Sequence, residues 1–225
     1  MTRAEARRER RKVERREAIL LAAARVFEDK GASAVTMDDV AEAADVSKGT
    51  LYLYFSSKDD LFLALTHHPL DAVLERFEAL VDSDEDGLSL LRSLLVAHHE
   101  VVHTHASRMR IALGSMCSGF EVDPDTPSLR DYSERVQRLR EAYMGAIERG
   151  QADGSIRADL DPEQAGLALW AGNFGASFIR MNSDRFRVHA EAGRPLPPFE
   201  RVHAAFMSLF LRSIASSPES VEASS

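Results

Sequence analysis

The sequence predicts an all-α protein. Apolar residues recur at three- and four-residue spacings through most of the 225 residues, as on one face of an amphipathic helix. Helix-capping residues, glycines and prolines separate these periodic stretches. No stretch shows the strict apolar–polar alternation of a half-buried strand. The chain is therefore expected to fold as a succession of helices without a sheet.

Local signals mark the helix ends in the first sixty residues. Apolar positions over roughly 15–30 share one face, and Gly31 follows them as a helix stop. Thr36 is an N-cap for a second helix that ends near residue 44, and two aspartates occupy its first turn, where the helix dipole favours negative charge. After a tight connector, Ser47 caps a third short helix over 48–54.

A long fourth helix is expected over residues 58–81, with Ser57 as its cap. Pro69 lies inside it, and because proline lacks the N–H of a helical hydrogen bond, we expect a kink or break there. Another helix follows over 87–105. A shorter one then runs through Met109, Leu113 and Met116.

The second half of the chain continues this pattern. Residues 119–127 predict a loop, and a helix over 129–152 ends in the turn at Asp153 and Gly154. Asp161 and Pro162 are a cap and a first-turn proline for a helix that runs through 165–181. The last helix spans 199–214, and the tail from Ser216 is expected to fray.

Composition excludes several classes of protein. One cysteine, Cys117, cannot form an internal disulfide, which favours a reducing cytoplasm, and its apolar surroundings favour a packing role over redox sensing. No apolar run reaches the length of a membrane span, and the charged start is not followed by the apolar region of a secretory signal. We therefore expect a globular cytoplasmic protein that does not enter a membrane.

Charge is distributed unevenly along the chain. The net charge is -8, yet residues 1–16 hold eight basic residues against three glutamates. A basic end on an acidic body is suited to orienting a protein on a polyanion. The alternative is a solvated helical extension laced with Glu and Arg and without a partner.

The second and third helices satisfy the geometry of a helix-turn-helix, in which one helix crosses the DNA backbone and the next enters the major groove. Small, basic and hydroxyl side chains open the third helix, where they would reach phosphates and base edges. Leu51 and Phe55 are expected to face inward against Phe27, Val40, Ala41 and Leu61. Lys58 adds a cation beside the free N–H groups at the start of the fourth helix.

The run from Val35 to Phe62, VTMDDVAEAADVSKGTLYLYFSSKDDLF, resembles the helix-turn-helix of the TetR family of bacterial transcriptional regulators. The likeness covers residues 18–62. It implies that the DNA-binding positions are Thr36, Ser47, Lys48, Gly49, Thr50, Tyr52, Tyr54 and Lys58. Leu53 departs from the family's polar or aromatic residue, which puts a base contact from that position in doubt.

The same resemblance implies an all-helical C-terminal domain that binds a small molecule and forms a homodimer through its last two helices. Small residues at 165–181 and an apolar stripe at 199–214 agree with this plan, although both could instead face the chain's own core. The expected dimer residues are Ala168, Gly172, Gly175, Ala176, Phe199, Val202, Phe206 and Phe210.

Histidines and adaptable apolar residues suggest where an effector would bind. His99 and His103 are four residues apart on one helical face, which is also a two-ligand metal spacing, but no HExxH motif or third ligand accompanies them. The expected pocket residues, which could equally be plain core, are His67, His68, His99, His103, Met109, Leu113, Met116, Tyr143, Trp170 and Phe174.

These patterns favour one function over two others. The predicted organisation is a basic extension over 1–16, a three-helix DNA-binding head with the helix-turn-helix over 17–60, an all-helical ligand-binding and dimerisation domain over 61–216, and a tail over 217–225. We expect a homodimeric transcriptional repressor that binds a palindromic double-stranded operator and is released by a small, largely apolar effector, with no catalytic residues, metal or cofactor. The alternatives are a histidine-centred metal-binding protein or metalloenzyme, and a helical scaffold for other proteins.

Overall fold

The computed structural model describes residues 2–31, 34–106, 123–181 and 198–217. These residues form helices joined by turns, with one isolated antiparallel bridge between Ile156 and Ala215. They divide into two compact units. The first holds the described residues up to Pro69 and those from 123 to Glu134, and the second holds Leu70–Ala106 and those from Arg135 onward.

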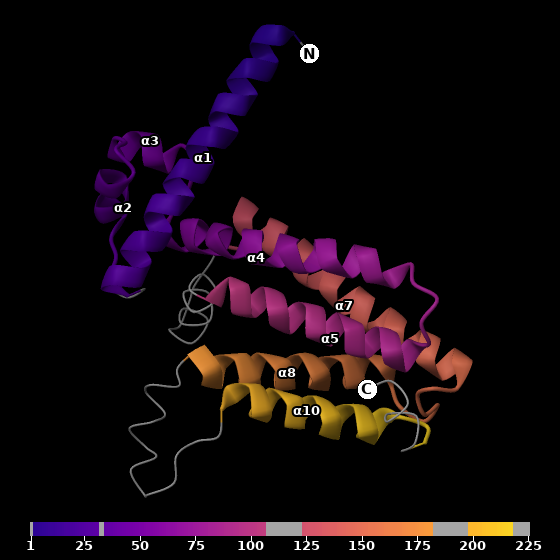
Figure 1. The fold of residues 1–225 in the computed structure, drawn as a ribbon. Coiled ribbons are helices and arrows are strands. Elements are labelled where there is room, and N and C mark those ends of the chain that lie inside the picture. Colours follow the sequence, from indigo (N-terminus) through magenta and orange to yellow (C-terminus); the bar gives the residue numbers. More distant parts are fainter. Residues whose placement is uncertain (1, 32–33, 107–122, 182–197, 218–225) are drawn as a thin grey trace, which may run out of the picture. The chain divides into compact units, whose positions relative to one another are not determined.

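In the first unit α1 spans Arg3–Lys30, α2 spans Met37–Ala43, α3 spans Lys48–Tyr52, and α4, Lys58–Val81, begins (Figure 1). The start expected for α1 near residue 15 is wrong, because the helix begins at Arg3. Thr2 caps it: the Thr2 hydroxyl accepts from the Glu5 N–H, and the Glu5 carboxylate accepts from the Thr2 N–H. The third helix ends at Tyr52, two residues earlier than expected.

One apolar core joins the helices of the first unit. Leu51 and Phe55 are 0% and 1% exposed, and they lie in the same cluster as Phe27 and Val40, as expected. Burying such side chains is worth about 1.5–3 kcal/mol each. The remaining buried members of this cluster are Ile19, Leu20, Ala23, Ala24, Val35, Met37, Ala41, Leu61, Phe62, Ala64 and Leu65.

The second unit contains the remainder of α4, α5 (Gly87–Thr104), most of α7 (Pro127–Asp153), α8 (Pro162–Met181) and α10 (Phe199–Ile214). Helices α8 and α10 lie side by side and antiparallel (Figure 1). Gly87 meets α7 so closely that a Cβ added to it would lie 2.0 Å from the Gly150 nitrogen. The core draws on every helix of this unit, with Phe77, Leu91, Leu94, Ile147, Leu169 and Leu211 among its members.

Of the kink or break expected at Pro69, the break is wrong, since α4 continues through the proline as one helix, and the kink stays a prediction. The start of α4 supplies Leu61 to the first core, and its later turns supply Phe77 to the second. The other helix bounds follow the local signals closely. Asp161 accepts a hydrogen bond from the Gln164 N–H at 2.9 Å, as an N-cap does, and α10 has the bounds predicted for it.

Some expectations fall on residues outside the described part of the chain. They concern the short helix through Met109, Leu113 and Met116, together with the surroundings of Cys117.

Candidate functional site

The third helix is fixed at both ends by its own residues. The Ser47 hydroxyl accepts from the Thr50 N–H at 3.1 Å and lies 2.8 Å from the Thr50 hydroxyl, so it caps the helix. Leu51 and Phe55 anchor the inner side of this segment in the core. The short helix is consequently held by one cap and two buried anchors.

The outer side of this helix carries the residues expected to meet DNA. Lys48 and Gly49 are exposed, Tyr52 is 45% exposed, and Leu53 is 83% exposed. Apart from its chain neighbours and the backbone of its own helix, the nearest described atom to a Cβ added at Gly49 is the Ser47 hydroxyl oxygen, at 4.0 Å. The space next to Gly49 is therefore open.

The second helix begins with a capping box. The Thr36 hydroxyl accepts from the Asp39 N–H at 3.2 Å, and the Asp39 carboxylate accepts from the Thr36 N–H at 2.9 Å. Lys30, at the end of α1, donates to the same carboxylate at 2.7 Å. The hydrogen bond from Lys30, followed by that from Thr36, lowers the pKa of Asp39 to about 2. Asp39 therefore stays ionised and ties α1 to α2.

An ion pair joins α2 to α3 across the turn. The Lys48 ammonium lies 2.8 Å from one Asp38 carboxylate oxygen and 3.0 Å from the other, and this pairing raises the pKa of Lys48. Both side chains are largely exposed, so the pair exchanges readily with other partners. Between them, Asp45 takes a φ of 51°, a left-handed conformation that aspartate tolerates better than most residues.

A second polar network starts α4. The Ser57 hydroxyl accepts from the Asp60 N–H at 3.0 Å, which confirms the predicted cap. Asp60 is 4% exposed and accepts from the Ser56 N–H at 2.7 Å and from the Ser56 hydroxyl at 3.0 Å. This network fixes the chain directly after the third helix.

The structure thus gathers the eight predicted DNA-binding residues on the first unit. Thr36, Ser47, Lys48, Gly49 and Tyr52 are exposed. Thr50, Tyr54 and Lys58 are partly buried, and Tyr54 packs against the core. Sequence reasoning missed Asp38 and Asp39 as residues that hold this surface in place. The T-x-x-D spacing from Thr36 to Asp39 was the available signal for the second of these.

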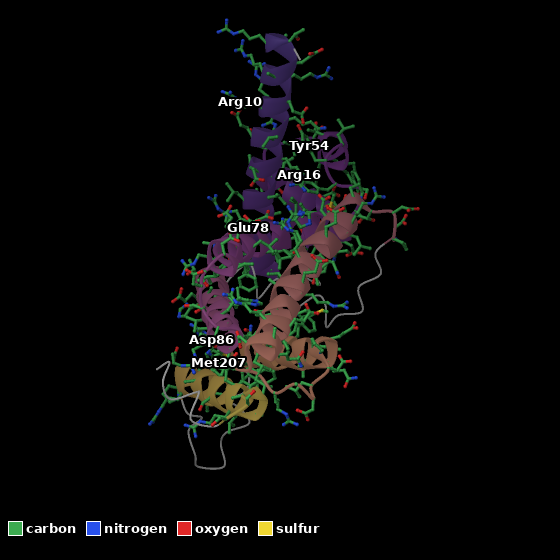
Figure 2. The ribbon with its side chains drawn as sticks, turned by 90° about the vertical axis from the view of Figure 1, so that its right-hand side faces the viewer. Arg10, Arg16, Tyr54, Glu78, Asp86 and Met207 are labelled. Carbon is green, nitrogen blue, oxygen red and sulfur yellow. The ribbon has the colours of Figure 1, made fainter. Side chains whose placement is uncertain are left out.

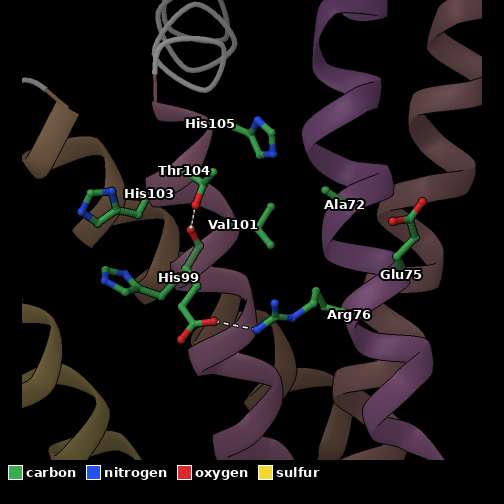
Figure 3. A pocket seen from close by; sticks show the side chains of 9 residues that line it. Ala72, Glu75, Arg76, His99, Val101, His103, Thr104 and His105 are labelled. Carbon is green, nitrogen blue, oxygen red and sulfur yellow. Dashed lines mark hydrogen bonds and ion pairs between the residues drawn. The ribbon is translucent and has the colours of Figure 1, made fainter.

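The second unit contains a hollow of about 640 Å³ between α4 and α5, here called the α4–α5 hollow. Arg76 donates to Glu100 at 2.7 Å across it. Figure 3 shows Val101 and His105 directed toward α4, whereas His99 and His103 point to the other side of α5. The lining residues are Ala72, Glu75, Arg76, His99, Glu100, Val101, His103, Thr104 and His105.

Two polar pairs lie inside the second unit. Nδ1 of His98 and the hydroxyl of buried Tyr143 share a hydrogen bond of 2.6 Å. His99 stacks on His203 with ring centroids 3.7 Å apart, and His203 lies 3.3 Å from the Asn173 amide oxygen. Burial lowers the pKa of His98 and of His203 to about 4. Both imidazoles are therefore neutral near pH 7.

The predicted pocket residues are not all brought together. His99 and His103 line the α4–α5 hollow, but Tyr143, Trp170 and Phe174 are not among its lining residues. Trp170 stacks on Phe174 at 5.3 Å. In the first unit His68 is exposed, and buried His67 lies 3.1 Å from the Ser128 carbonyl. Glu75, Arg76 and His105 line the hollow and were missed.

The predicted dimer residues occupy α8 and α10. A Cβ added at Gly172 would lie 2.3 Å from the Phe206 ring, so this pair is packed within one chain. Ala176 is buried, and Ala168 is exposed. Phe199, Val202 and Phe210 are partly buried, and so is Gly175. The most exposed large apolar side chains of these helices are Leu209 at 72%, which belongs to the apolar stripe expected over 199–214, and Leu167 at 64%, which the sequence did not single out.

The described residues show neither a metal-binding group nor a membrane-spanning helix. No three His, Cys, Asp or Glu side chains of the described ranges form a group that would hold a metal ion. None of the helices described here has the length and apolar character needed to cross a bilayer.

Known proteins share both the motif and the fold. The family model for bacterial regulatory proteins of the tetR family matches residues 19–65. The HTH-type transcriptional repressor KstR2 of Rhodococcus jostii is 30% identical over 151 residues, which are 67% of this chain and 72% of that protein. The HTH-type transcriptional activator FasR of Mycolicibacterium smegmatis is 34% identical over 98 residues, 44% of this chain and 45% of that protein.

Solved structures agree on the fold. The ketosteroid transcriptional regulator KstR2 of Mycobacterium tuberculosis aligns with a TM-score of 0.60 and 23% identity, over 89% of this chain and 95% of that one. FadR of Bacillus subtilis, solved with stearoyl-CoA, aligns with a TM-score of 0.66 and 17% identity, over 88% and 98%. From the capped helix-turn-helix and these relatives together, the chain belongs to the TetR family of bacterial transcriptional regulators.

Proposed function

We propose that this regulator is a homodimeric repressor that binds a palindromic operator in the cytoplasm and leaves it when a small molecule binds the second unit. One observation carries the DNA-binding part: α3 is capped, anchored and open on its outer face. Lys48 would pair with a phosphate or a guanine edge, and Gly49 admits the backbone closely. Thr36, Ser47, Thr50, Tyr52, Tyr54 and Lys58 complete the contact surface.

Exposed apolar surface on α8 and α10 supports the homodimer. Leu167 and Leu209 are 64% and 72% exposed. Two copies of this face, related by a two-fold axis, would bury these side chains in an isologous interface. Such a dimer presents two reading helices to half-sites about 34 Å apart, one turn of the duplex, or a multiple of that spacing.

The α4–α5 hollow supports a small-molecule effector. Its volume of about 640 Å³ is within the range of ligand sites, and its walls combine Ala72 and Val101 with Arg76 and histidines. An effector with an apolar body and a polar group suits this lining. Because α4 contributes residues to both cores, this helix is our candidate for the element that carries the effector signal to the reading head.

Fluorescence anisotropy with DNA from immediately upstream of the chain's own gene tests the DNA-binding proposal. Preferential binding over unrelated DNA, weakening steeply with salt, is expected. Lys48→Ala should lower operator affinity about tenfold, whereas Arg138→Ala, an exposed cation of the second unit, should not. Equal affinity for both DNAs would contradict a specific operator.

The release step has its own test. Pro69→Ala restores the helical N–H in α4 and should weaken effector-induced release more than it weakens DNA affinity. Effectors are first screened as compounds that lower the anisotropy of the bound operator. Equal loss of release and affinity would contradict a role of Pro69 in transmission.

A further inference from the structure

The first turns of α1 extend beyond the packed part of the first unit. All residues from Thr2 to Arg15 are exposed, and the first buried residue of the helix is Ile19. Residues 3–15, here called the basic arm, would reach about 20 Å at 1.5 Å per residue. Figure 2 shows Arg10 on this projecting stretch and Arg16 nearer the core.

The arm begins beside the reading helix. The Arg16 guanidinium lies 5.1 Å from the centre of the Phe55 ring, and Phe55 follows α3 by three residues. At its other end, α1 is tied to α2 through Lys30 and Asp39. The helix thus passes along the helix-turn-helix from the start of α2 to the end of α3 and then continues outward (Figure 1).

The charges of the arm are arranged on shared faces. It carries seven basic residues and three glutamates. Arg3, Arg7, Arg8 and Arg11 line one shallow hollow together with Ala4, and Glu5 is engaged in capping the helix. Arg3, Arg7 and Arg11 follow one another at four-residue spacing, and such like-charge pairs mildly destabilise an isolated helix, so an anionic partner along this row would stabilise it.

We propose that the basic arm binds the DNA phosphates that flank each half-site, outside the bases read by α3. This inference rests on the proposed operator binding. Arginine side chains in a row suit a line of phosphates, which fix position without specifying sequence. A membrane surface suits the arm less well, because Val13 is its only large apolar residue and an interfacial helix needs an apolar face.

Flanking DNA of different length tests the proposal. The shortest operator fragment bound by the full chain is compared with the same fragment extended by about ten base pairs, roughly one helical turn, on each side. The extension should raise affinity about tenfold or more near 0.1 M salt. It should also steepen the plot of log affinity against log salt by about 0.9 for each added phosphate contact.

Three variants assign the effect. Replacing Arg3, Arg7, Arg8 and Arg11 together by Gln keeps helix propensity and should abolish the gain from flanking DNA. Replacing the same four by Lys should keep most of it, because the positive charge remains. The matched control replaces four exposed arginines of the second unit by Gln, namely Arg138, Arg140, Arg157 and Arg201, and should behave as the unmodified chain.

The outcomes separate this proposal from operator binding itself. If the fourfold Gln variant keeps both the flank gain and the salt slope, the arm does not contact DNA, while specific operator binding stands. If the fourfold Gln variant loses the same factor of affinity for the short and the extended fragment, the arm acts within the site read by α3, and the proposed binding to flanking DNA is wrong. If the unmodified chain binds no DNA, both proposals fail.

Discussion

The capping pairs of the first unit and the interior polar pairs of the second differ in how far apart their residues lie in the sequence. Thr36 and Asp39, like Ser47 and Thr50, are three positions apart. His98 and Tyr143 are 45 positions apart, and Asn173 and His203 are 30. The capping pairs depend on residues that are neighbours in the sequence. The interior pairs form only when helices that are far apart in the sequence pack together.

The largest expected effect comes from the core of the reading head. Phe55→Ala removes a ring that is 1% exposed and should lower the free energy of unfolding by about 3–5 kcal/mol, with loss of operator binding. Urea unfolding followed by circular dichroism measures it. Leu53→Ala, at an 83% exposed position, should change stability by less than about 0.5 kcal/mol. Similar losses in both variants would contradict the described core.

Lowering the pH should destabilise the second unit before it affects the capping carboxylate of the first. Burial lowers the pKa of His98 in the folded chain to about 4, below the value of about 6.5 of a solvent-exposed histidine, so protonation favours unfolding. His98 alone should cost the second unit about 3 kcal/mol as pH falls from about 6.5 to 4, and His203, whose pKa is also lowered to about 4, should add to this loss. The capping carboxylate Asp39, with a pKa of about 2, should remain ionised through that range and lose its contribution only below about pH 4.

Trp170, the single tryptophan, reports the second unit in this titration. Urea midpoints from its fluorescence are compared between pH 7 and 4.5. His98→Gln keeps a partner for Tyr143 but does not titrate, so it should reduce the pH dependence and leave the part that His203 carries. If the urea midpoint of that variant changes between pH 7 and 4.5 as much as in the unmodified chain, His98 does not cause the pH dependence.

Close helix packing gives the next effect. Gly87→Ala places a Cβ against the backbone of Gly150 and should destabilise the second unit by about 1–3 kcal/mol. Gly145→Ala is the matched control on α7, because nothing lies within 4 Å of its Cβ, and it should stabilise the helix by about 0.5–1 kcal/mol. Denaturant midpoints measure both. A neutral Gly87→Ala would refute the α5–α7 contact.

The smallest effect concerns the cap of the third helix. Ser47→Ala removes the acceptor of the Thr50 N–H and should cost about 1 kcal/mol, with weaker operator binding. Ser133→Ala, whose hydroxyl donates to the Leu129 carbonyl within α7, should leave both unchanged. Equal changes in stability and operator binding in the two variants would contradict a capping role for Ser47.

The same contrast explains how far the sequence could be read. Helix ends followed from local residues such as Ser57, Asp161 and Gly31, and the buried positions of Leu51 and Phe55 followed from periodicity. The start of α1 was missed although Thr2 and Glu5 carry the capping spacing. Only the break predicted as one alternative at Pro69 is wrong: α4 is continuous, with residues on either side of the proline buried in the two cores.

The candidate effector site was less predictable for a physical reason. His99 and His103 were chosen because they share a helical face, and His105 was not chosen, although it points into the α4–α5 hollow. Which side of α5 faces α4 depends on packing between elements and not on local spacing. The partners of His98 and His99, Tyr143 and His203, are separated from them by 45 and more than 100 positions.

The ion pair between Lys48 and Asp38 has a consequence for how such a protein searches a chromosome. Away from DNA, this lysine already has an anion beside it, so a phosphate must displace a carboxylate, which offsets part of the free energy of the new contact. At a nonspecific DNA site, Lys48 gains only this exchange of a carboxylate for a phosphate, and a genome holds about a million or more such sites. Asp38 should therefore shorten the residence time of the protein on nonspecific DNA. Long residence is then expected only at sites where the rest of α3 also fits.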